Sequence, residues 1–268
     1  MSLLVKRIEK ARNIWAAEGL AQAIAAACRS FYGLAADPCS RMLARFLDGW
    51  CEMSSLLTAR LTHRPLVHVI GDSHVLAFKR QPSFLVYHVG PATAYKLGQD
   101  HSTTQGRQRV LRILNRVKSG DIALLSFGEI DCRIHIYYQY KKHDERIPLS
   151  QWIDRTIVSY GAFLLDVAKR GCRLCVYGIP PAGRQPNRYG YPYYAAPDLR
   201  VGIFREFNER LKAFCAAQSI PYIDIFVAAS DGEGFISEEF ASDEVHLNAR
   251  AVEFVRGWFN RELGIDLS

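Results

Sequence analysis

The chain has 268 residues, and 49% of them are hydrophobic, which is enough to bury one large core with at most a modest appendage. No apolar run approaches the roughly 18–20 residues that a membrane-spanning helix needs, so the composition predicts a soluble globular protein. The net charge of +7 favours an anionic neighbour, such as an acidic glycan, a nucleotide-linked substrate or a lipid headgroup, and the sequence contains no nucleic-acid-binding motif.

The first part of the chain, residues 1–65, predicts a helical extension. Apolar residues recur at steps of three to five over 3–33, a break follows at 35–40, and a second helical pattern covers 41–62. The extension carries nine Lys and Arg residues against five Asp and Glu residues. Two interpretations stay open: helices that pack on the main domain, or a basic amphipathic helix in residues 1–34 that contacts a membrane surface.

A different pattern begins at residue 66 and continues to the C-terminus at 268. Short apolar runs rich in Val, Ile and Leu alternate with helical segments, and several runs lack the polar alternation of a half-exposed strand. The candidate strands are 66–70, 84–89, 121–127, 173–179 and 221–226, and the candidate helices are 75–80, 104–118, 151–170, 200–218 and 247–263. Strand–helix alternation predicts right-handed crossovers and a parallel five-stranded sheet.

The seven cysteines show no paired spacing that would suggest a disulfide framework, which favours a reducing compartment and a cytoplasmic location. Cys172 and Cys175 form a C-x-x-C, but they lie in a predicted strand, where residues three apart point to opposite faces. No other Cys/His cluster has the spacing of zinc ligands. The sequence therefore predicts no metal site.

Ligands of parallel α/β sheets bind beyond the carboxyl ends of the strands, which directs attention to the residues that follow each apolar run. Ser73 follows the first run, and its hydroxyl can act as a nucleophile if a base takes its proton. Asp243 and His246 lie three residues apart just before the last helix, a spacing that lets the carboxylate reach Nδ1 and leaves Nε2 free. The alternative is that Asp72 or Ser73 simply caps helix 75–80.

These segments resemble the SGNH (GDSL-like) hydrolases. The resemblance covers roughly residues 66–260 and rests on four blocks in the family's order: GDS, a Gly after the second strand, a Gly-x-x-Asp after the third, and D-x-x-H-L-N. It implies a three-layer α/β/α, flavodoxin-like fold that needs no cofactor. It also implies that Ser73 is the nucleophile, His246 the base and Asp243 its orienting partner.

For the oxyanion hole, the resemblance implies donors at the backbone N–H groups of Ser73 and Gly90. The family's third donor is an Asn side chain, but Ile130 occupies that place here and cannot donate. Loss of one donor typically lowers the rate about a hundred- to thousandfold, which would weaken a hydrolase without abolishing it. We expect the Arg133 guanidinium to take over this role or to bind an anionic substrate.

Further residues are expected to contact the substrate, because they lie in the same strand-end segments or in long loops. The loop 178–200 is rich in Pro and Tyr and is too long for an ordinary connection, and the segment 137–149 is expected to form a second wall of the same cleft. The residues predicted to bind substrate are Asp72, His74, Glu129, Arg133, His135 and Tyr189.

The leading hypothesis is a serine esterase that removes an acyl group, an O-acetyl group in the first instance, from a carbohydrate or glycan precursor through an acyl-enzyme. One alternative is an acyltransferase that uses the same triad to move an acyl group onto a sugar. The other is a non-catalytic glycan-binding or scaffold protein, an interpretation that Ile130 motivates. The expected partner in each case is a small-molecule or glycan ligand.

Overall fold

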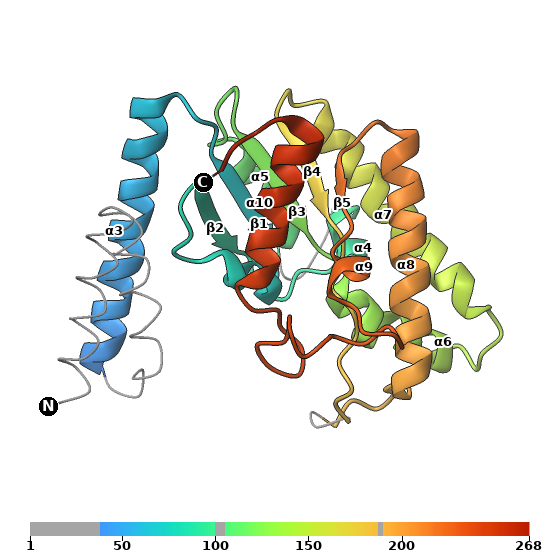
Figure 1. Ribbon diagram of the computed structural model, residues 1–268. Coiled ribbons are helices and arrows are strands. Elements are labelled where there is room, and N and C mark those ends of the chain that lie inside the picture. The colour runs from blue at the N-terminus through green and yellow to red at the C-terminus, as the bar shows by residue number, and fades with distance from the viewer. Residues whose placement is uncertain (1–37, 100–104, 187–189, 268) are drawn as a thin grey trace, which may run out of the picture.

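A parallel sheet forms the centre of the structure, a computed structural model that describes residues 38–99, 105–186 and 190–267 (Figure 1). The strands are β1 (Val67–Gly71), β2 (Phe84–His88), β3 (Ile122–Ser126), β4 (Arg173–Tyr177) and β5 (Tyr222–Ile223). Their order is β2-β1-β3-β4-β5, and every neighbouring pair is parallel. The chain leaves β1 toward β2 and then returns to β3 on the other side, so the strand order reverses beside β1, where such sheets form their binding crevice.

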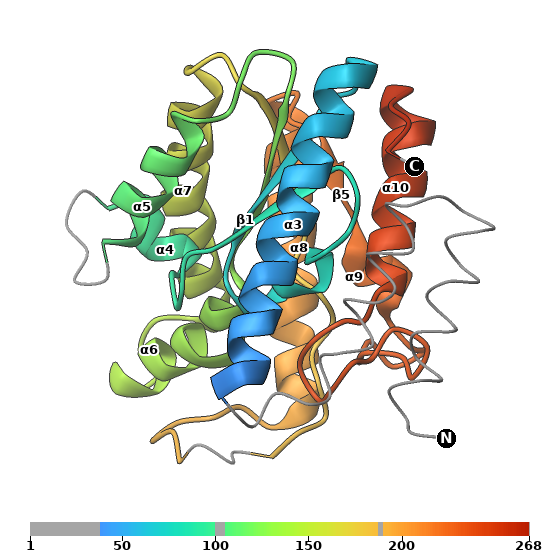
Figure 2. The same ribbon diagram turned by 90° about the vertical axis from the view of Figure 1, so that its left-hand side faces the viewer.

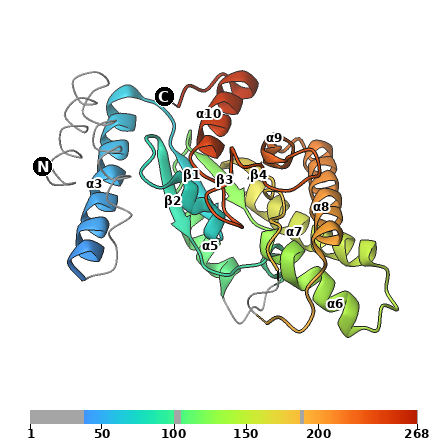
Figure 3. The same cartoon turned by 60° about the horizontal axis from the view of Figure 1, so that its bottom comes forward.

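Helices cover both faces of this sheet, which confirms the predicted three-layer α/β/α architecture (Figure 3). Successive residues of one strand serve the two cores: Leu125 of β3 packs in one and Leu124 in the other. One face is covered by α4 (Ala94–Leu97), α5 (Gly106–Leu114), α6 (Ile136–Lys142), α7 (Leu149–Ala168) and α8 (Pro197–Ala217). The other face is covered by η2 (Ser73–Phe78), α9 (Ile225–Ala229) and α10 (Arg250–Leu263).

Helix α3 (Pro38–Thr62) lies beside β2, at the edge of the sheet (Figures 1 and 2). Asp48 attaches it there, 2.6 Å from Nε of Arg80 and 3.4 Å from Nζ of Lys79. Its exposed side chains include an apolar stripe at helical spacing: Phe46, Trp50, Met53, Leu57 and Leu61. Residues 1–37, and with them the segment considered for membrane contact, lie outside the described residues. Among the described helices, none combines the length and the hydropathy required to cross a bilayer.

Two segments differ from the expectation. The run 221–226 was predicted as one strand, but β5 ends at Ile223 because Asp224 caps the next helix, its carboxylate accepting a hydrogen bond from the N–H of Val227 at 3.2 Å. After β3 the chain forms a π-helical turn, η3 (Asp131–His135), which continues into α6. Neither η3 nor α6 was predicted, and together they carry the segment after β3 over the carboxyl end of the sheet.

Candidate active site

Three side chains from the two ends of the α/β domain meet at the carboxyl edge of the sheet. The Ser73 Oγ lies 2.9 Å from Nε2 of His246. Nδ1 of His246 lies 2.9 Å from Oδ2 of Asp243, and the same carboxylate accepts hydrogen bonds from the N–H groups of Val245 and His246 at 2.8 Å. Burial alone would raise the pKa of Asp243, but these N–H donors lower it below its ordinary value. The carboxylate therefore stays ionised beside the imidazole.

The local structure at the end of β1 leaves the Ser73 hydroxyl free for His246. Asp72 takes the N-cap position of η2, where its Oδ1 accepts a hydrogen bond from the N–H of His74 at 3.0 Å. Ser73 is the first residue of the 3₁₀ turn, so it has no capping role, although its type would suit one. The sequence left the cap open between these two residues, and the structure assigns it to Asp72.

The chain that follows β2 lies beside the start of η2, where the backbone N–H groups of Ser73 and Gly90 are the predicted oxyanion donors. Val89 donates its N–H to the Gly71 carbonyl at 2.9 Å, which places Gly90, the next residue, beside the start of η2. Gly90 has φ +82°, a conformation that favours glycine. Within the described ranges, no acceptor is hydrogen-bonded to the N–H of Ser73 or of Gly90. Ile130 lies half-buried at the start of η3 and offers an apolar side chain there.

Three of the residues predicted to bind substrate are buried next to the triad. Asp72, His74 and Glu129 are 2%, 5% and 4% exposed, and their contact with substrate stays a prediction. Glu129 accepts a hydrogen bond from Nε of Arg133 at 2.6 Å and forms an ion pair with Nε2 of His74 at 3.6 Å. The ring of His74 packs 5.0 Å from that of His246, centroid to centroid. The network therefore supports the proposed base from below.

The charges of this network depend on one another. Burial opposes ionisation of Glu129, but His74 and Arg133 lower its pKa to about 2. Burial likewise opposes protonation of His74, yet Glu129 and Asp72 raise its pKa. Burial raises the pKa of Asp72 to about 6, and its Oδ2 has no hydrogen-bond partner in the described part of the chain. Arg133 is bound to Glu129 through Nε, so its service as a third oxyanion donor stays a prediction.

Asp131 joins the segment after β3 to the segment after β2. Its Oδ2 accepts a hydrogen bond from the N–H of Ala94 at 2.7 Å and its Oδ1 one from the N–H of Tyr95 at 3.2 Å. The residue is 1% exposed, and burial raises its pKa to about 7. Asp131 thus holds α4, and with it the chain that follows Gly90, against η3.

We expect the variant Asp131→Asn to flatten the pH dependence of the free energy of unfolding between about pH 4 and pH 7. Folding raises the pKa of this carboxyl group, so the group favours the folded state most at low pH, where it is protonated in both the folded and the unfolded chain. That contribution is lost as pH rises from the ordinary pKa of the group to about 7. Urea unfolding of both proteins across this window measures the difference. The exposed Glu262→Gln is the matched control, and an identical pH slope in wild type and Asp131→Asn would contradict the assignment.

Arg200 joins the two described ends of the loop 178–200 to each other. Arg200 at the start of α8 is 1% exposed and donates hydrogen bonds to the carbonyls of Ala195, Gly183 and Gln185 at 2.7–2.9 Å. Tyr189, predicted to bind substrate, lies outside the described residues. His135 is exposed and lines a cavity that begins at Pro91, as does the half-buried Gln139 from the segment expected to form a second wall.

The residues of this cavity that sequence reasoning missed include Lys96, Trp152 and Arg155. Lys96 lies shortly after Gly90, the glycine that forms the second block of the resemblance, so the segment that contains this block could have drawn attention to it. Trp152 and Arg155 belong to α7, far from every motif in the sequence, and no signal in their own segment marks them.

Comparison with known proteins identifies the fold. No family model and no curated protein matches the chain. Among solved structures, a Bacteroides fragilis protein provisionally assigned as an acylhydrolase has a TM-score of 0.52 and 14% identity, and the match covers 75% of this chain and 89% of that one. A protein of Streptococcus pneumoniae provisionally assigned as a platelet activating factor has a TM-score of 0.50 and 14% identity, with coverage of 81% and 98%.

A GDSL-like lipase from Bacteroides thetaiotaomicron matches with a TM-score of 0.49 and 14% identity over 70% of this chain and 82% of that one. At such identities a match concerns the arrangement of the chain in space and leaves substrate and chemistry open. The chain therefore shares its fold, a five-stranded parallel sheet covered by helices on both faces, with the Bacteroides fragilis and Streptococcus pneumoniae structures.

Proposed function

We propose that this protein is a serine esterase that removes an acyl group, an O-acetyl group in our proposal, from a carbohydrate through an acyl-enzyme. The observation that carries the proposal is the 2.9 Å contact between Ser73 Oγ and His246 Nε2, with Asp243 on the opposite ring nitrogen. A hydroxyl so placed can lose its proton to the imidazole as it attacks, which is the requirement for nucleophilic catalysis by serine.

In the first half-reaction, His246 Nε2 takes the proton of Ser73 as Oγ bonds to the ester carbonyl carbon. The N–H groups of Ser73 and Gly90 stabilise the oxyanion, and the bond to the sugar oxygen breaks as His246 returns the proton to the leaving hydroxyl. Water then attacks the acyl-serine with His246 again as base, releasing the free acid and Ser73. Asp243 holds the imidazole in the required orientation and stabilises its protonated form.

We expect a fluorophosphonate probe to add its phosphonyl group to the wild-type chain at Ser73 and to leave the variant Ser73→Ala unlabelled. Intact-mass measurement detects the adduct, because the probe forms a stable bond only to an activated hydroxyl. The matched control is Ser119→Ala, which removes an exposed serine at the opposite edge of the sheet and should label like wild type. A wild-type chain that stays unlabelled would argue for the non-catalytic alternative.

A further inference from the structure

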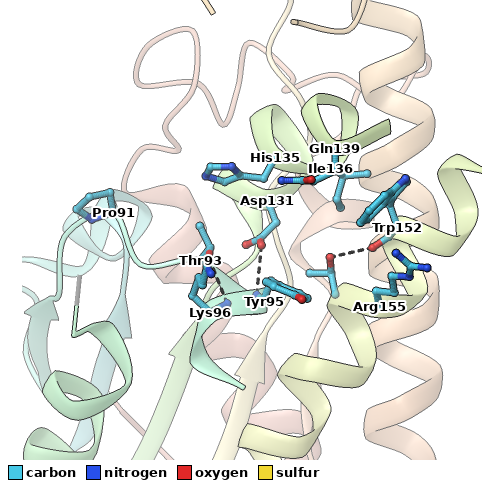
Figure 4. Close-up of a pocket in the computed structure, with 11 residues that line it drawn as sticks. Pro91, Thr93, Tyr95, Lys96, Asp131, His135, Ile136, Gln139, Trp152 and Arg155 are labelled. Carbon is cyan, nitrogen blue, oxygen red and sulfur yellow. Dashed lines mark hydrogen bonds between the residues drawn. The ribbon is translucent and has the colours of Figure 1, made fainter. Parts of the chain in front are cut away.

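A cavity of about 330 Å³ opens next to the proposed oxyanion hole (Figure 4). Its wall begins at Pro91, the residue after Gly90, and continues through α4, η3, α6 and α7. Ligand pockets commonly hold about 300–1,000 Å³, so this space is on the scale of a ring-sized group and exceeds what an acetyl group fills. A substrate whose ester carbonyl lies at Ser73 therefore has room here for a second part of its structure.

Two cations of the cavity have no acidic partner among the residues that the structure describes. Lys96 and Arg155 are exposed, and among the described residues neither forms an ion pair with a carboxylate. Each lies instead near an aromatic ring: Nζ of Lys96 is 5.8 Å from the centroid of Tyr95, and Cζ of Arg155 is 4.5 Å from that of Trp152. This differs from Arg184, whose guanidinium binds two carboxylates at the surface.

The other titratable groups of the wall do little to offset this charge. Asp131 is the carboxylate among the described lining residues, and both of its oxygens are occupied by backbone N–H groups, as Figure 4 shows for Tyr95. Burial, together with Lys96 and Arg133, lowers the pKa of His135, so this imidazole is neutral near pH 7. The cavity thus presents a positive potential.

The lining also argues against a long acyl chain as the occupant. A hydrocarbon chain would remove the water around Lys96, Arg155 and Gln139 without giving them hydrogen bonds, which is unfavourable. An anionic ligand, by contrast, gains charge-assisted hydrogen bonds from the ammonium and guanidinium groups. Aromatic side chains such as Tyr95 and Trp152 bury the apolar face of a ligand ring.

We propose that this cavity binds a pyranose unit that carries an anionic group, with Lys96 and Arg155 binding the anion and with the acylated hydroxyl of the same substrate directed at Ser73. This inference deepens the proposed esterase function and rests on it for the position of the ester. A carboxylate and a phosphate share the required chemistry, and the experiment separates them.

Binding to the full-length variant Ser73→Ala, which lacks the nucleophile, tests the cavity independently of turnover. The probes are D-glucuronate, D-glucose 6-phosphate and D-glucose, titrated against the protein by NMR. We expect at least one anionic sugar to bind about tenfold more tightly than glucose, since a charge-assisted hydrogen bond typically contributes this much. The preferred anion identifies the carboxylate or phosphate class.

Lys96→Gln and Arg155→Gln, each added to Ser73→Ala, are expected to weaken binding of the preferred anion by about five- to tenfold. Both side chains are exposed, so the fold tolerates these changes. Lys118→Gln is the matched control, because it removes one exposed positive charge at the opposite edge of the sheet. Equal binding of all three sugars, no binding of any, or anion binding unchanged in both glutamine variants would overturn the inference.

The two proposals fail in different ways. A chain that is labelled by fluorophosphonate but shows no preference for an anionic sugar retains the esterase function and loses the anion-binding cavity. A chain that binds the anionic sugar through Lys96 and Arg155 but stays unlabelled retains the cavity and loses the esterase function.

Discussion

Replacing Ser73 with Ala is expected to lower kcat for hydrolysis of an aryl acetate by about 10³- to 10⁶-fold, and His246→Ala should have a comparable effect. The reason is that the hydroxyl and the imidazole, 2.9 Å apart, act as one unit: without either, no acyl-serine forms. The double variant should be no slower than the worse of the two single variants, because the second change removes nothing that still operates. Steady-state kinetics on the four proteins measure this.

The activity that remains in these variants tests the predicted oxyanion donors. The N–H groups of Ser73 and Gly90 remain in Ser73→Ala, so some acceleration over the uncatalysed reaction should persist. Ser119→Ala, an exposed change at the opposite edge of the sheet, should leave the kinetics unaltered. Effects of the two single variants that multiply in the double variant would show that Ser73 and His246 act separately, which contradicts a triad.

Much of the fold, and the three triad side chains, could be predicted because their signals are local. Each strand is a short apolar run, and the parallel topology brings every segment that follows a strand to one edge, which places Ser73 and Gly90 side by side. The D-x-x-H spacing fixes the contact between Asp243 and His246 within a single turn. These inferences need no knowledge of long-range side-chain packing.

Sequence reasoning is limited where one local pattern is compatible with two structures. The apolar run 221–226 suits a strand or a buried helix, and the capping hydrogen bond that Asp224 accepts from the N–H of Val227 selects the helix after Ile223. His74 and Glu129 follow strand ends, as ligand-binding residues do, but their side chains turn inward and pair with each other. Sequence position predicts the edge of the sheet and leaves the direction of a side chain open.

The cavity residues could not be predicted for a different reason. Lys96 and Arg155 are about sixty residues apart, and they line one cavity because α4 packs against α7, where Ser159 Oγ donates a hydrogen bond to the carbonyl of Tyr95 at 2.7 Å. A single sequence carries no signal for such a pairing, since the exposed face of a helix tolerates any charged residue. Only the structure shows that, within the described part of the chain, neither cation is paired with a carboxylate.

Replacing Glu129 with Ala is expected to lower the free energy of unfolding by about 3–5 kcal/mol, a range typical of breaking a buried ion pair by removing one partner. Glu129 is 4% exposed, accepts a hydrogen bond from Arg133 and faces His74, so the variant leaves the buried His74 and the half-buried Arg133 without this counter-charge. Denaturant unfolding at neutral pH measures the loss. Because His74 packs against His246, esterase activity should fall as well.

The size of this effect distinguishes a buried network from a surface pair. Glu233→Ala removes a partner of Arg184, but both side chains are more than half exposed, so water screens the pair and the free energy of unfolding should change little. The pKa of Glu129 lies near 2, below its ordinary value, so its contribution is complete above about pH 4.5 and is lost as pH falls toward 2. The difference between wild type and Glu129→Ala should therefore shrink in acid. A loss in the free energy of unfolding below about 1 kcal/mol at neutral pH would mean that water or rearranged neighbours replace the Glu129 carboxylate. It would contradict the view that the buried network holds His74 beneath the proposed base.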